Sequence, residues 1–361
     1  MNIVLLLPDA KLGGAQNVLL RLAEEFAKSH EVEICCLSKA GTLHESVSST
    51  LQFRFLDSGA RLGFFGAFKA FRALAGFMRS RPNATMLSTG TGTNLLACAA
   101  RLFAPNGSRL VIREACSSKN TGSRTIAFLK RLLYPRADGM IGVSDGVAGE
   151  LQRLAGKRQP VASIPNPVDV QRLQALADAK DERLSTFPRP YLLTVGRLVP
   201  QKNTALLVEA FAGIAGDVAE HLVIIGGGPL EAALREQIVW HGLQSRVHLL
   251  GEITNPHPWY KRASAFALTS DWEGYPNVIL EALAHGLPVV STDCEFGPRQ
   301  ILDNNRFGHL VRTGDDVGMA NSILKTMKGT MVFEAWDAER FNAPSIASRY
   351  LAFMESCRNG I

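Results

Sequence analysis

Short apolar runs alternate with helix-length amphipathic segments along most of this chain, and this pattern constrains the fold most strongly. Before residue 168 the strand candidates are Ile3–Leu7, Val32–Leu37, Met86–Ser88, Leu110–Arg113, Met140–Val143 and Val161–Ile164. After a polar stretch they are Tyr191–Val195, Leu222–Ile225, Val247–Leu250, Phe266–Leu268 and Val289–Ser291. Strands that alternate with helices form parallel sheets covered by helices, so the sequence predicts two α/β domains.

The length of 361 residues agrees with two domains, because one hydrophobic core rarely serves more than about 300 residues. We expect an N-terminal domain at 1–168, a linker at 169–189, and a C-terminal domain at 190–340. Residues 341–361 are predicted to form a helix that packs back towards the N-terminal domain. Two such domains predict a ligand-binding cleft between them, beyond the carboxyl ends of the strands.

The charge is distributed unevenly along the chain. Residues 1–168 hold 21 Lys+Arg and 11 Asp+Glu, a net charge of +10, whereas residues 169–361 hold 18 and 22, a net charge of −4. Such a basic half favours an anionic partner such as phospholipid, nucleic acid or a phosphorylated substrate. A solvated basic face is the plainer alternative. Nucleic acid is not expected, because no recognised module or basic-aromatic strand array is present.

The cysteines and the amino terminus indicate the compartment. The six cysteines lack the spacing of zinc ligands or of a disulfide framework, which predicts reduced, mostly buried thiols. The only apolar run at the amino terminus, Ile3–Leu7, is too short for a signal peptide, and no apolar stretch reaches the length of a spanning helix. We therefore expect a cytoplasmic protein.

Two glycine turns follow predicted strands. Gly13 and Gly14 precede a helix that starts near Ala15, and paired glycines there let backbone amides approach an anion at the helix N-terminus. A tight strand-to-helix turn needs glycine in any case. Gly226-Gly227-Gly228 repeats the arrangement without a full dinucleotide-binding pattern, so we interpret it as a structural turn.

Two cations, Arg197 and Lys202, lie in the loop after the first strand of the second domain. An arginine fork and a compact ammonium together neutralise a diphosphate well. Two solvated loop cations are the simpler explanation of this spacing.

The segment 269–288 is the most informative, because it places Glu273 in a loop and Glu281 inside the helix that follows. Were the intervening residues helical, the two carboxyl groups would be separated by about 12 Å along the axis. A hydrolase carboxylate pair is closer, at about 5–9.5 Å, so two separate hydroxyl-recognition roles fit better. Asp271 and Glu273 alone supply too few ligands for a metal.

At this point the sequence resembles the retaining glycosyltransferases of family four, over nearly the whole chain. The resemblance rests on four motifs: EGYPNVILEALAHGLPVV, which contains Glu273 and Glu281, GRLVPQKN at 196–203, GGAQ at 13–16 and NPVD at 166–169. The resemblance implies the GT-B fold, an α/β architecture of two facing Rossmann-like domains with a cleft between them.

The resemblance also implies residue roles. Glu281 would hold the nucleotide ribose, Glu273 the transferred sugar, and Arg197 and Lys202 the diphosphate. The backbone amides of Gly13, Gly14, Asn277, Val278 and Ile279 would surround the phosphates, and the backbone at Ile253 would read the base.

The segment 294–301 is similar to that of members that extend surface polysaccharide or lipid-linked oligosaccharide, with Gln300 where those members often have Glu. Ile112-Arg113-Glu114-Ala115 resembles the acceptor-side segment of "REA" members, which makes Arg113 and Glu114 acceptor-side candidates. An ordinary ion pair at a strand end explains them equally.

The implied activity is a hexosyl transfer with retention, from a nucleotide-sugar to a glycan or polyprenyl-linked acceptor, in polysaccharide or lipopolysaccharide biosynthesis. UDP is the expected carrier and GDP its competitor, with no cofactor and no metal. Retention without an enzyme nucleophile implies a front-face route, in which the acceptor attacks beside the departing diphosphate. The alternatives are a catalytically silent nucleotide-binding protein and a sugar-nucleotide epimerase.

An anionic membrane surface is the further partner that we expect. In residues 61–81 a helical stripe of Phe64, Phe68, Phe71, Ala75 and Met78 is flanked by Lys69, Arg72 and Arg79. A helix packed on the core with a basic edge has a similar pattern. With the basic N-terminal half, the stripe predicts peripheral binding to the inner face of the plasma membrane.

Overall fold

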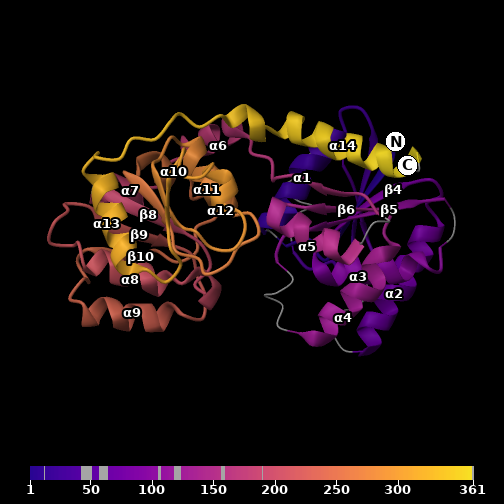
Figure 1. Ribbon diagram of the computed structural model, residues 1–361, viewed down its shortest axis with the longest axis horizontal. Coiled ribbons are helices and arrows are strands. Elements are labelled where there is room, and N and C mark those ends of the chain that lie inside the picture. Colours follow the sequence, from indigo (N-terminus) through magenta and orange to yellow (C-terminus); the bar gives the residue numbers. More distant parts are fainter. Residues whose placement is uncertain are drawn as a thin grey trace. The chain divides into compact units, whose positions relative to one another are not determined.

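The computed structural model describes residues 1–11, 13–41, 51–56, 64–104, 107–117, 123–155, 159–188 and 190–359. The chain divides into two compact units (Figure 1). The first unit comprises Met1–Pro167 with Arg340–Ile361, and the second comprises Val168–Glu339. Each unit is described by itself.

The first unit contains a seven-stranded parallel sheet with the order β3-β2-β1-β4-β5-β6-β7. Its strands are β1 (Asn2–Leu7), β2 (Glu31–Cys36), β3 (Gln52–Phe55), β4 (Thr85–Thr89), β5 (Arg109–Glu114), β6 (Gly139–Gly142) and β7 (Val161–Ser163). Its helices are α1 (Gly14–Phe26), α2 (Phe64–Arg79), α3 (Thr91–Arg101), α4 (Arg124–Leu133), α5 (Asp145–Ala155) and α14 (Ala343–Asn359).

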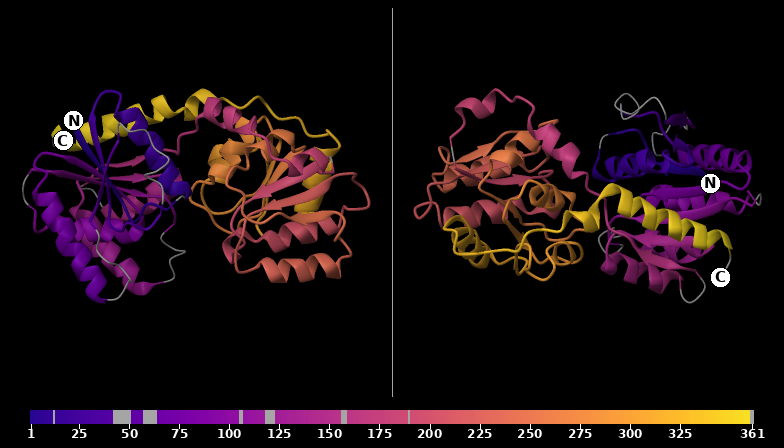
Figure 2. Two further views of the ribbon diagram at one scale, coloured as in Figure 1. Left: turned by 180° about the vertical axis from the view of Figure 1, so that it is seen from behind. Right: turned by 90° about the horizontal axis from the view of Figure 1, so that it is seen from above.

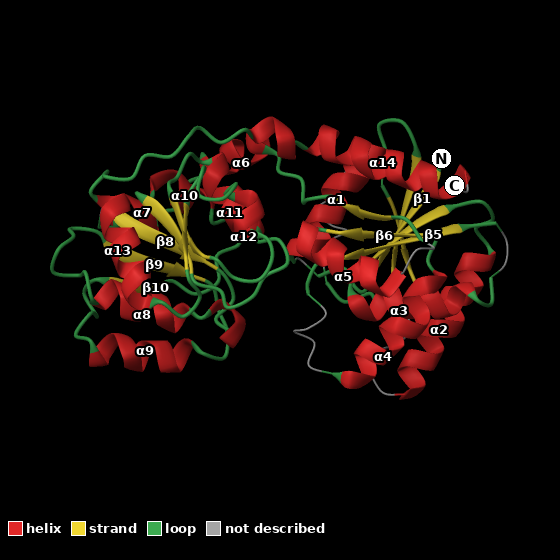
Figure 3. Cartoon of the chain, in the orientation of Figure 1, coloured by secondary structure: helices red, strands yellow, loops and turns green. Residues whose placement is uncertain are grey.

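Helices cover both faces of this sheet (Figure 3). Alternate residues of β1 explain the two layers: Ile3 and Leu5 pack with α1 and α14, whereas Val4 packs with α2 and α3. All three side chains are fully buried. A strand covered on both faces needs a continuous apolar run, which explains the apolar sequence of β1 from Ile3 to Leu7.

The second unit contains a six-stranded parallel sheet with the order β10-β9-β8-β11-β12-β13. Its strands are β8 (Tyr191–Val195), β9 (His221–Ile225), β10 (Val247–Leu249), β11 (Ala265–Leu268), β12 (Val289–Thr292) and β13 (His309–Val311). Its helices are α6 (Val170–Ala177), α7 (Arg183–Thr186), α8 (Thr204–Ala212), α9 (Glu231–Trp240), α10 (His257–Arg262), α11 (Asn277–Ala284), α12 (Pro298–Ile301) and α13 (Asp316–Met327). Both sheets thus have the doubly wound order of a Rossmann-like fold.

The segment 169–189, expected to be a linker, is instead part of the second unit. It forms α6 and α7, and α6 packs against α10 and α11. Buried apolar positions within a polar sequence, Leu173 and Leu184, hold these helices in place.

The C-terminal helix α14 packs against α1 and β5 of the first unit (Figure 2). Tyr350 and Met354 of this helix are fully buried, which makes α14 part of that unit's core.

The sequence pattern did not reveal β3 and β13. Both are edge strands of their sheets. The side chains of β3 are alternately exposed and half-buried, and β13 has only three residues. Edge position alone does not explain this, because the other edge strands, β7 and β10, were predicted; the sequences of β3 and β13 contain no continuous apolar run.

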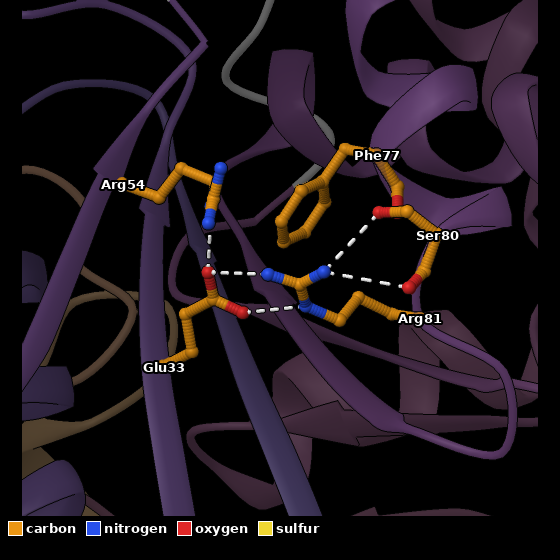
Figure 4. Close-up of polar contacts among 5 residues, drawn as sticks. All are labelled: Glu33, Arg54, Phe77, Ser80 and Arg81. Carbon is orange, nitrogen blue, oxygen red and sulfur yellow. Dashed lines mark hydrogen bonds and ion pairs between the residues drawn. The ribbon is translucent and has the colours of Figure 1, made fainter.

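Charged side chains join the edge of the first sheet to the end of α2 (Figure 4). The Arg81 guanidinium donates to both carboxylate oxygens of Glu33 at 2.8 and 3.0 Å, and the Arg54 Nε donates at 2.8 Å. Burial raises the pKa of Glu33, but the hydrogen bonds and charges of both arginines outweigh it and hold the pKa below its usual value.

Five of the six cysteines are buried, Cys116 is exposed, and all are free thiols, as the sequence predicted. Within the described ranges, no helix has the length and apolarity that crossing a membrane requires.

Candidate functional site

The carboxyl ends of β8 and β11 form the point where the strand order of the second sheet reverses. From β8 the chain continues outwards to β9 and β10, and from β11 it continues the other way to β12 and β13. In open α/β sheets ligands bind at this switch point. Here the loop after β8 carries Arg197 and Lys202, and the loop after β11 carries Glu273.

The glycine turn after β9 supports the loop after β8. The Gly196 amide donates to the Ile225 carbonyl at 2.9 Å, and the Leu198 amide donates to the Gly227 carbonyl at 2.8 Å. Gly226 has a φ of +140°, and a Cβ on it would collide with the Gly196 carbonyl oxygen. The turn therefore has the structural role predicted for it.

Backbone and amide groups join the loops after β8 and β11. The Asp271 amide donates to the Gln201 carbonyl, and the Gln201 side chain donates to the Trp272 carbonyl, both at 2.9 Å. Asn203, at a φ of +42°, caps α8 and donates to the Asp271 carboxylate at 2.9 Å. These contacts fix the two loops relative to each other, so the side chains between them are placed precisely.

Lys202 and Glu273 meet between these loops as an ion pair. The two side chains are 17% and 8% exposed, and the Ser270 hydroxyl donates to the same carboxylate at 2.7 Å. A buried ion pair is stable only when further hydrogen bonds satisfy it. Ser270, fully buried, supplies one of them.

Arg197 lies on the loop after β8, which also carries Lys202, and its side chain is exposed. Among the described residues, no hydrogen bond or ion pair engages its guanidinium. The loop thus presents one cation held by a carboxylate and one that is available to an anion.

Glu281 lies on α11, half-buried, and accepts a hydrogen bond from the Tyr260 hydroxyl at 3.2 Å. Glu273 precedes α11, in the loop after β11. The two glutamates therefore have different partners, Lys202 for Glu273 and Tyr260 for Glu281.

The first turn of α11 contains the predicted phosphate-binding amides. Amides of a first helical turn have no partner inside the helix. Asn277 and Val278 are half-buried, whereas the side chain of Ile279 is fully buried and its amide donates to the Pro276 carbonyl at 3.1 Å. The Ile279 amide is thus already engaged in this structure.

Ile253, half-buried, lies in the loop after β10. This loop is joined to the glycine turn because the Gly226 amide donates to the Gly251 carbonyl at 2.8 Å. The loops after β8, β9 and β10 therefore form one continuous edge.

Gly13 and Gly14 belong to the first unit. Gly13 is the N-cap of α1 without a side-chain cap, and Gly14 is the exposed first residue of the helix. The first turn of α1 holds no acidic residue, which is compatible with an anion there.

Arg113 and Glu114 are buried, which contradicts their predicted contact with an acceptor. Arg113 is fully buried and donates to the Tyr350 hydroxyl at 3.0 Å, to Thr89 at 3.1 Å and to Asn166 at 2.5 Å. They form no ion pair with each other either, since neighbouring side chains of β5 point to opposite faces.

Glu114 points to the face of the sheet covered by α3 and α4. It accepts from Tyr134, from Thr91 at 3.2 Å and from Asn94 at 3.3 Å, and it pairs with Lys130 at 3.4 Å. This network attaches α4 to the sheet, which is a structural role.

Sequence reasoning missed Tyr260 and Ser270, which donate hydrogen bonds to the two glutamates. Tyr260 is 21 residues from Glu281, so only the fold brings the two together. Ser270 is three residues before Glu273 and lies within the informative segment 269–288, but its residue type alone did not mark it as a partner. The described part of the chain contains no group of three or more His, Cys, Asp or Glu side chains suited to a metal ion.

Two family profiles match the chain. The profile described as "Glycosyltransferase Family 4" matches residues 12–172, and the one described as "Glycosyl transferases group 1" matches residues 189–328. Together they cover most of both units.

Two relatives from Campylobacter jejuni are named for transfer to lipid-linked saccharides. The N-acetylgalactosamine-N,N'-diacetylbacillosaminyl-diphospho-undecaprenol 4-alpha-N-acetylgalactosaminyltransferase is 35% identical over 65% of this chain, which spans 64% of that relative's length. The GalNAc-alpha-(1->4)-GalNAc-alpha-(1->3)-diNAcBac-PP-undecaprenol alpha-1,4-N-acetyl-D-galactosaminyltransferase is 26% identical over 90% of this chain and 88% of its own.

Among solved structures, Anabaena HepE in complex with UDP and glucose superimposes with a TM-score of 0.81. It is 18% identical, and the match covers 99% of this chain and 100% of HepE. This likeness concerns the fold, which is GT-B. With that fold and both family profiles, the chain belongs to the glycosyltransferases of family four.

Proposed function

We propose that this protein is a retaining glycosyltransferase that moves a sugar from a nucleotide-sugar to a glycan or polyprenyl-linked acceptor. The observation that carries the proposal is the placement of Arg197, Lys202 and Glu273 at the switch point of the second sheet. These groups match a nucleotide-sugar donor, which combines a diphosphate with a polyhydroxylated ring.

Each residue has a distinct role in this proposal. Arg197 and Lys202 stabilise the negative charge that develops on the departing diphosphate, which is the task of a metal ion in other transferases. Glu273, held by Ser270, accepts hydroxyls of the transferred sugar. Glu281 accepts the ribose hydroxyls. Gly13, Gly14 and the amides of Asn277 and Val278 are assigned to the phosphates by the family resemblance, and Ile253 to the base.

The proposed chemistry needs no metal and no enzyme nucleophile. The acceptor hydroxyl attacks the anomeric carbon from the face that the diphosphate leaves, so the configuration is retained. The acceptor proton passes to the departing diphosphate oxygen. The protein supplies position and charge.

Thermal unfolding of the protein with UDP, GDP, ADP and their sugar conjugates, each with and without EDTA, tests the donor class. A ligand that binds only the folded state raises the midpoint. We expect UDP and one UDP-sugar to raise it equally with and without EDTA. A shift that EDTA abolishes would contradict metal independence, and no shift with any nucleotide would contradict the donor site.

Product analysis separates transfer from the alternatives. We expect UDP release that depends on an added polyprenyl-diphosphate saccharide, and an α-linked product. Conversion of the sugar-nucleotide to an isomer without acceptor would identify an epimerase. The proposed acceptor class is supported by the activities for which the two Campylobacter jejuni relatives are named, and by the similarity of segment 294–301 to that of polysaccharide-extending members.

We also propose that the first unit binds the inner face of the plasma membrane through α2, the end of α3, and α4. These neighbouring helices carry apolar side chains that are each more than half exposed: Phe68, Leu102, Phe103, Phe128 and Leu132. None of the three helices contains an acidic residue, while Lys69, Arg72, Arg124 and Arg131 are exposed on them. Exposed aromatics among cations fit an anionic lipid interface.

The predicted helical stripe of α2 is only partly free for this role. Ala75 and Met78 are buried in the core, Phe71 is half-buried, and Phe68 is exposed. The side chain of Phe64 lies outside the described residues. We therefore assign the proposed contact to the start of α2 and add α4 to it.

Sedimentation with phosphatidylglycerol-containing vesicles checks the membrane proposal. We expect the variant with Phe68→Asp and Phe128→Asp to bind at least tenfold more weakly, since each aromatic ring contributes about 1.5–3 kcal/mol when buried. Trp240→Asp on α9 is the control, because Trp240 is 79% exposed but lies in the other unit. Equal binding by all three proteins would contradict the assignment of the surface.

A further inference from the structure

Tyr260 contacts Glu281 and lies outside the motifs that the sequence analysis used. It lies on α10, is fully buried, and donates its hydroxyl hydrogen to Glu281 Oε2 at 3.2 Å. Burial and the neighbouring Glu281 charge raise the Tyr260 pKa well above its ordinary value. The hydroxyl therefore keeps its proton and always acts as a donor to the carboxylate.

Aromatic rings fix the Tyr260 side chain in this position. Its ring stacks on Phe266 at 5.6 Å, on His285 at 5.7 Å and on His257 at 5.8 Å between ring centroids. The two histidines are also hydrogen-bonded, with His257 Nδ1 and His285 Nε2 3.2 Å apart. The tyrosine ring thus has little freedom to rotate away from the carboxylate.

Tyr260 contacts α11 at two points. Glu281 is inside the helix and His285 is its C-cap, four residues later, so the two side chains lie on one face. The ring packs on His285 while the hydroxyl reaches Glu281. One residue of α10 therefore contacts both the carboxylate of α11 and the C-cap of that helix.

A fixed carboxylate binds hydroxyls more tightly than a mobile one. A free glutamate has many rotamers and loses that freedom when a ligand binds, which weakens binding. A carboxylate has about four acceptor positions, so one hydrogen bond from a tyrosine does not fill it. Pre-organisation by a buried neighbour is how such sites gain precision.

We propose that Tyr260 is a positioning residue that orients Glu281 for the ribose of the nucleotide. The inference rests on the proposed function in one respect, namely that Glu281 binds the ribose. Tyr260 itself touches neither the sugar nor the diphosphate in this assignment. Its effect is accordingly on nucleotide affinity, and not on the chemical step.

Tyr260→Phe in the full-length protein is the direct test, because it keeps the stacked ring and removes only the hydroxyl. We expect UDP to bind about five- to tenfold more weakly by calorimetry, with the KM of the donor raised to the same extent and kcat within twofold. The affinity for GDP is measured in parallel, because GDP is the alternative nucleotide carrier of the donor sugar.

Tyr191→Phe is the matched control for lost stability. Tyr191 is also fully buried in the second unit, and its hydroxyl donates at 2.8 Å to the backbone carbonyl of Trp259, the residue before Tyr260, and not to a carboxylate. We expect it to lower the unfolding midpoint as Tyr260→Phe does and to leave nucleotide affinity unchanged. Equal losses of affinity in both variants would show a structural effect and overturn the proposal.

A double-mutant cycle distinguishes failure of this inference from failure of the proposed function. We expect Glu281→Ala to weaken nucleotide binding and Tyr260→Phe to have no further effect in that background. If Glu281→Ala leaves affinity unchanged, the ribose assignment itself is wrong, and the proposal falls with it. If Glu281→Ala weakens binding but Tyr260→Phe does not, only the positioning role is overturned.

Discussion

Lys202→Ala is expected to lower kcat by about 10²- to 10³-fold while the protein remains folded. The variant removes a cation that stabilises the departing diphosphate, and losing one pre-organised group of this kind costs about 2.7–4 kcal/mol in the transition state. It also leaves the Glu273 carboxylate, 8% exposed, with Ser270 but without its cation. Steady-state release of the nucleoside diphosphate, measured at saturating donor, checks the prediction.

Two further variants test whether the effect is specific to the Lys202 ammonium. Lys328→Ala is the control, since Lys328 is an exposed cation at the end of α13, in the same unit. Lys202→Arg keeps the charge but not the compact ammonium, and we expect it to retain part of the activity. Turnover of Lys202→Ala within threefold of the unaltered protein would exclude the assigned role.

Glu114→Ala is expected to reduce the free energy of unfolding of the first unit by about 3–5 kcal/mol. The Lys130 side chain is only 3% exposed and pairs with Glu114, so the variant leaves a buried ammonium without a counter-ion. The hydroxyls of Thr91 and Tyr134 lose their acceptor as well. Urea unfolding, followed by far-UV circular dichroism, measures the change in the free energy of unfolding.

Glu33→Gln is the control for an ion pair nearer the surface, where we expect a loss of about 1 kcal/mol or less at neutral pH. The native pKa of Glu33 is lowered, so its stabilising effect is present above the unfolded pKa and disappears as the pH falls through the native pKa. The difference between Glu33→Gln and the unaltered protein should therefore vanish in acid.

A compensating variant identifies the cause of the Glu114 effect. Replacing Glu114 with Leu and Lys130 with Met removes both charges, and we expect it to recover much of the lost stability. If Glu114→Ala had the same urea midpoint of unfolding as the unaltered protein, the Glu114–Lys130 pair would not contribute to stability.

Much of the fold was predictable because burial on both faces of a parallel sheet requires apolar runs. The eleven predicted strands correspond to β1, β2 and β4 to β12, whereas the edge strands β3 and β13 carry no such run. The polar sequence of 169–189 hid two helices for a similar reason, since few of their side chains are buried.

The candidate site was predictable only in part. Arg197, Lys202, Glu273 and Glu281 lie in short local motifs, so residue spacing placed them on a loop or helix at the carboxyl end of a strand. The partner of each group was not predictable, because Lys202 and Glu273 are 71 residues apart in the chain and Tyr260 and Glu281 are 21 apart.

Arg113 and Glu114 show most clearly where local sequence ends and packing begins. As neighbours at a strand end they were predicted to contact an acceptor. Instead, Arg113 donates to Tyr350, 237 residues away, and Glu114 pairs with Lys130 of α4. The sequence by itself determined the two parallel sheets and the chemical nature of the candidate site, because both depend on residue types at short spacing. Only the tertiary structure decided which charges are buried, which are exposed and which groups hold them, because these depend on contacts between distant segments.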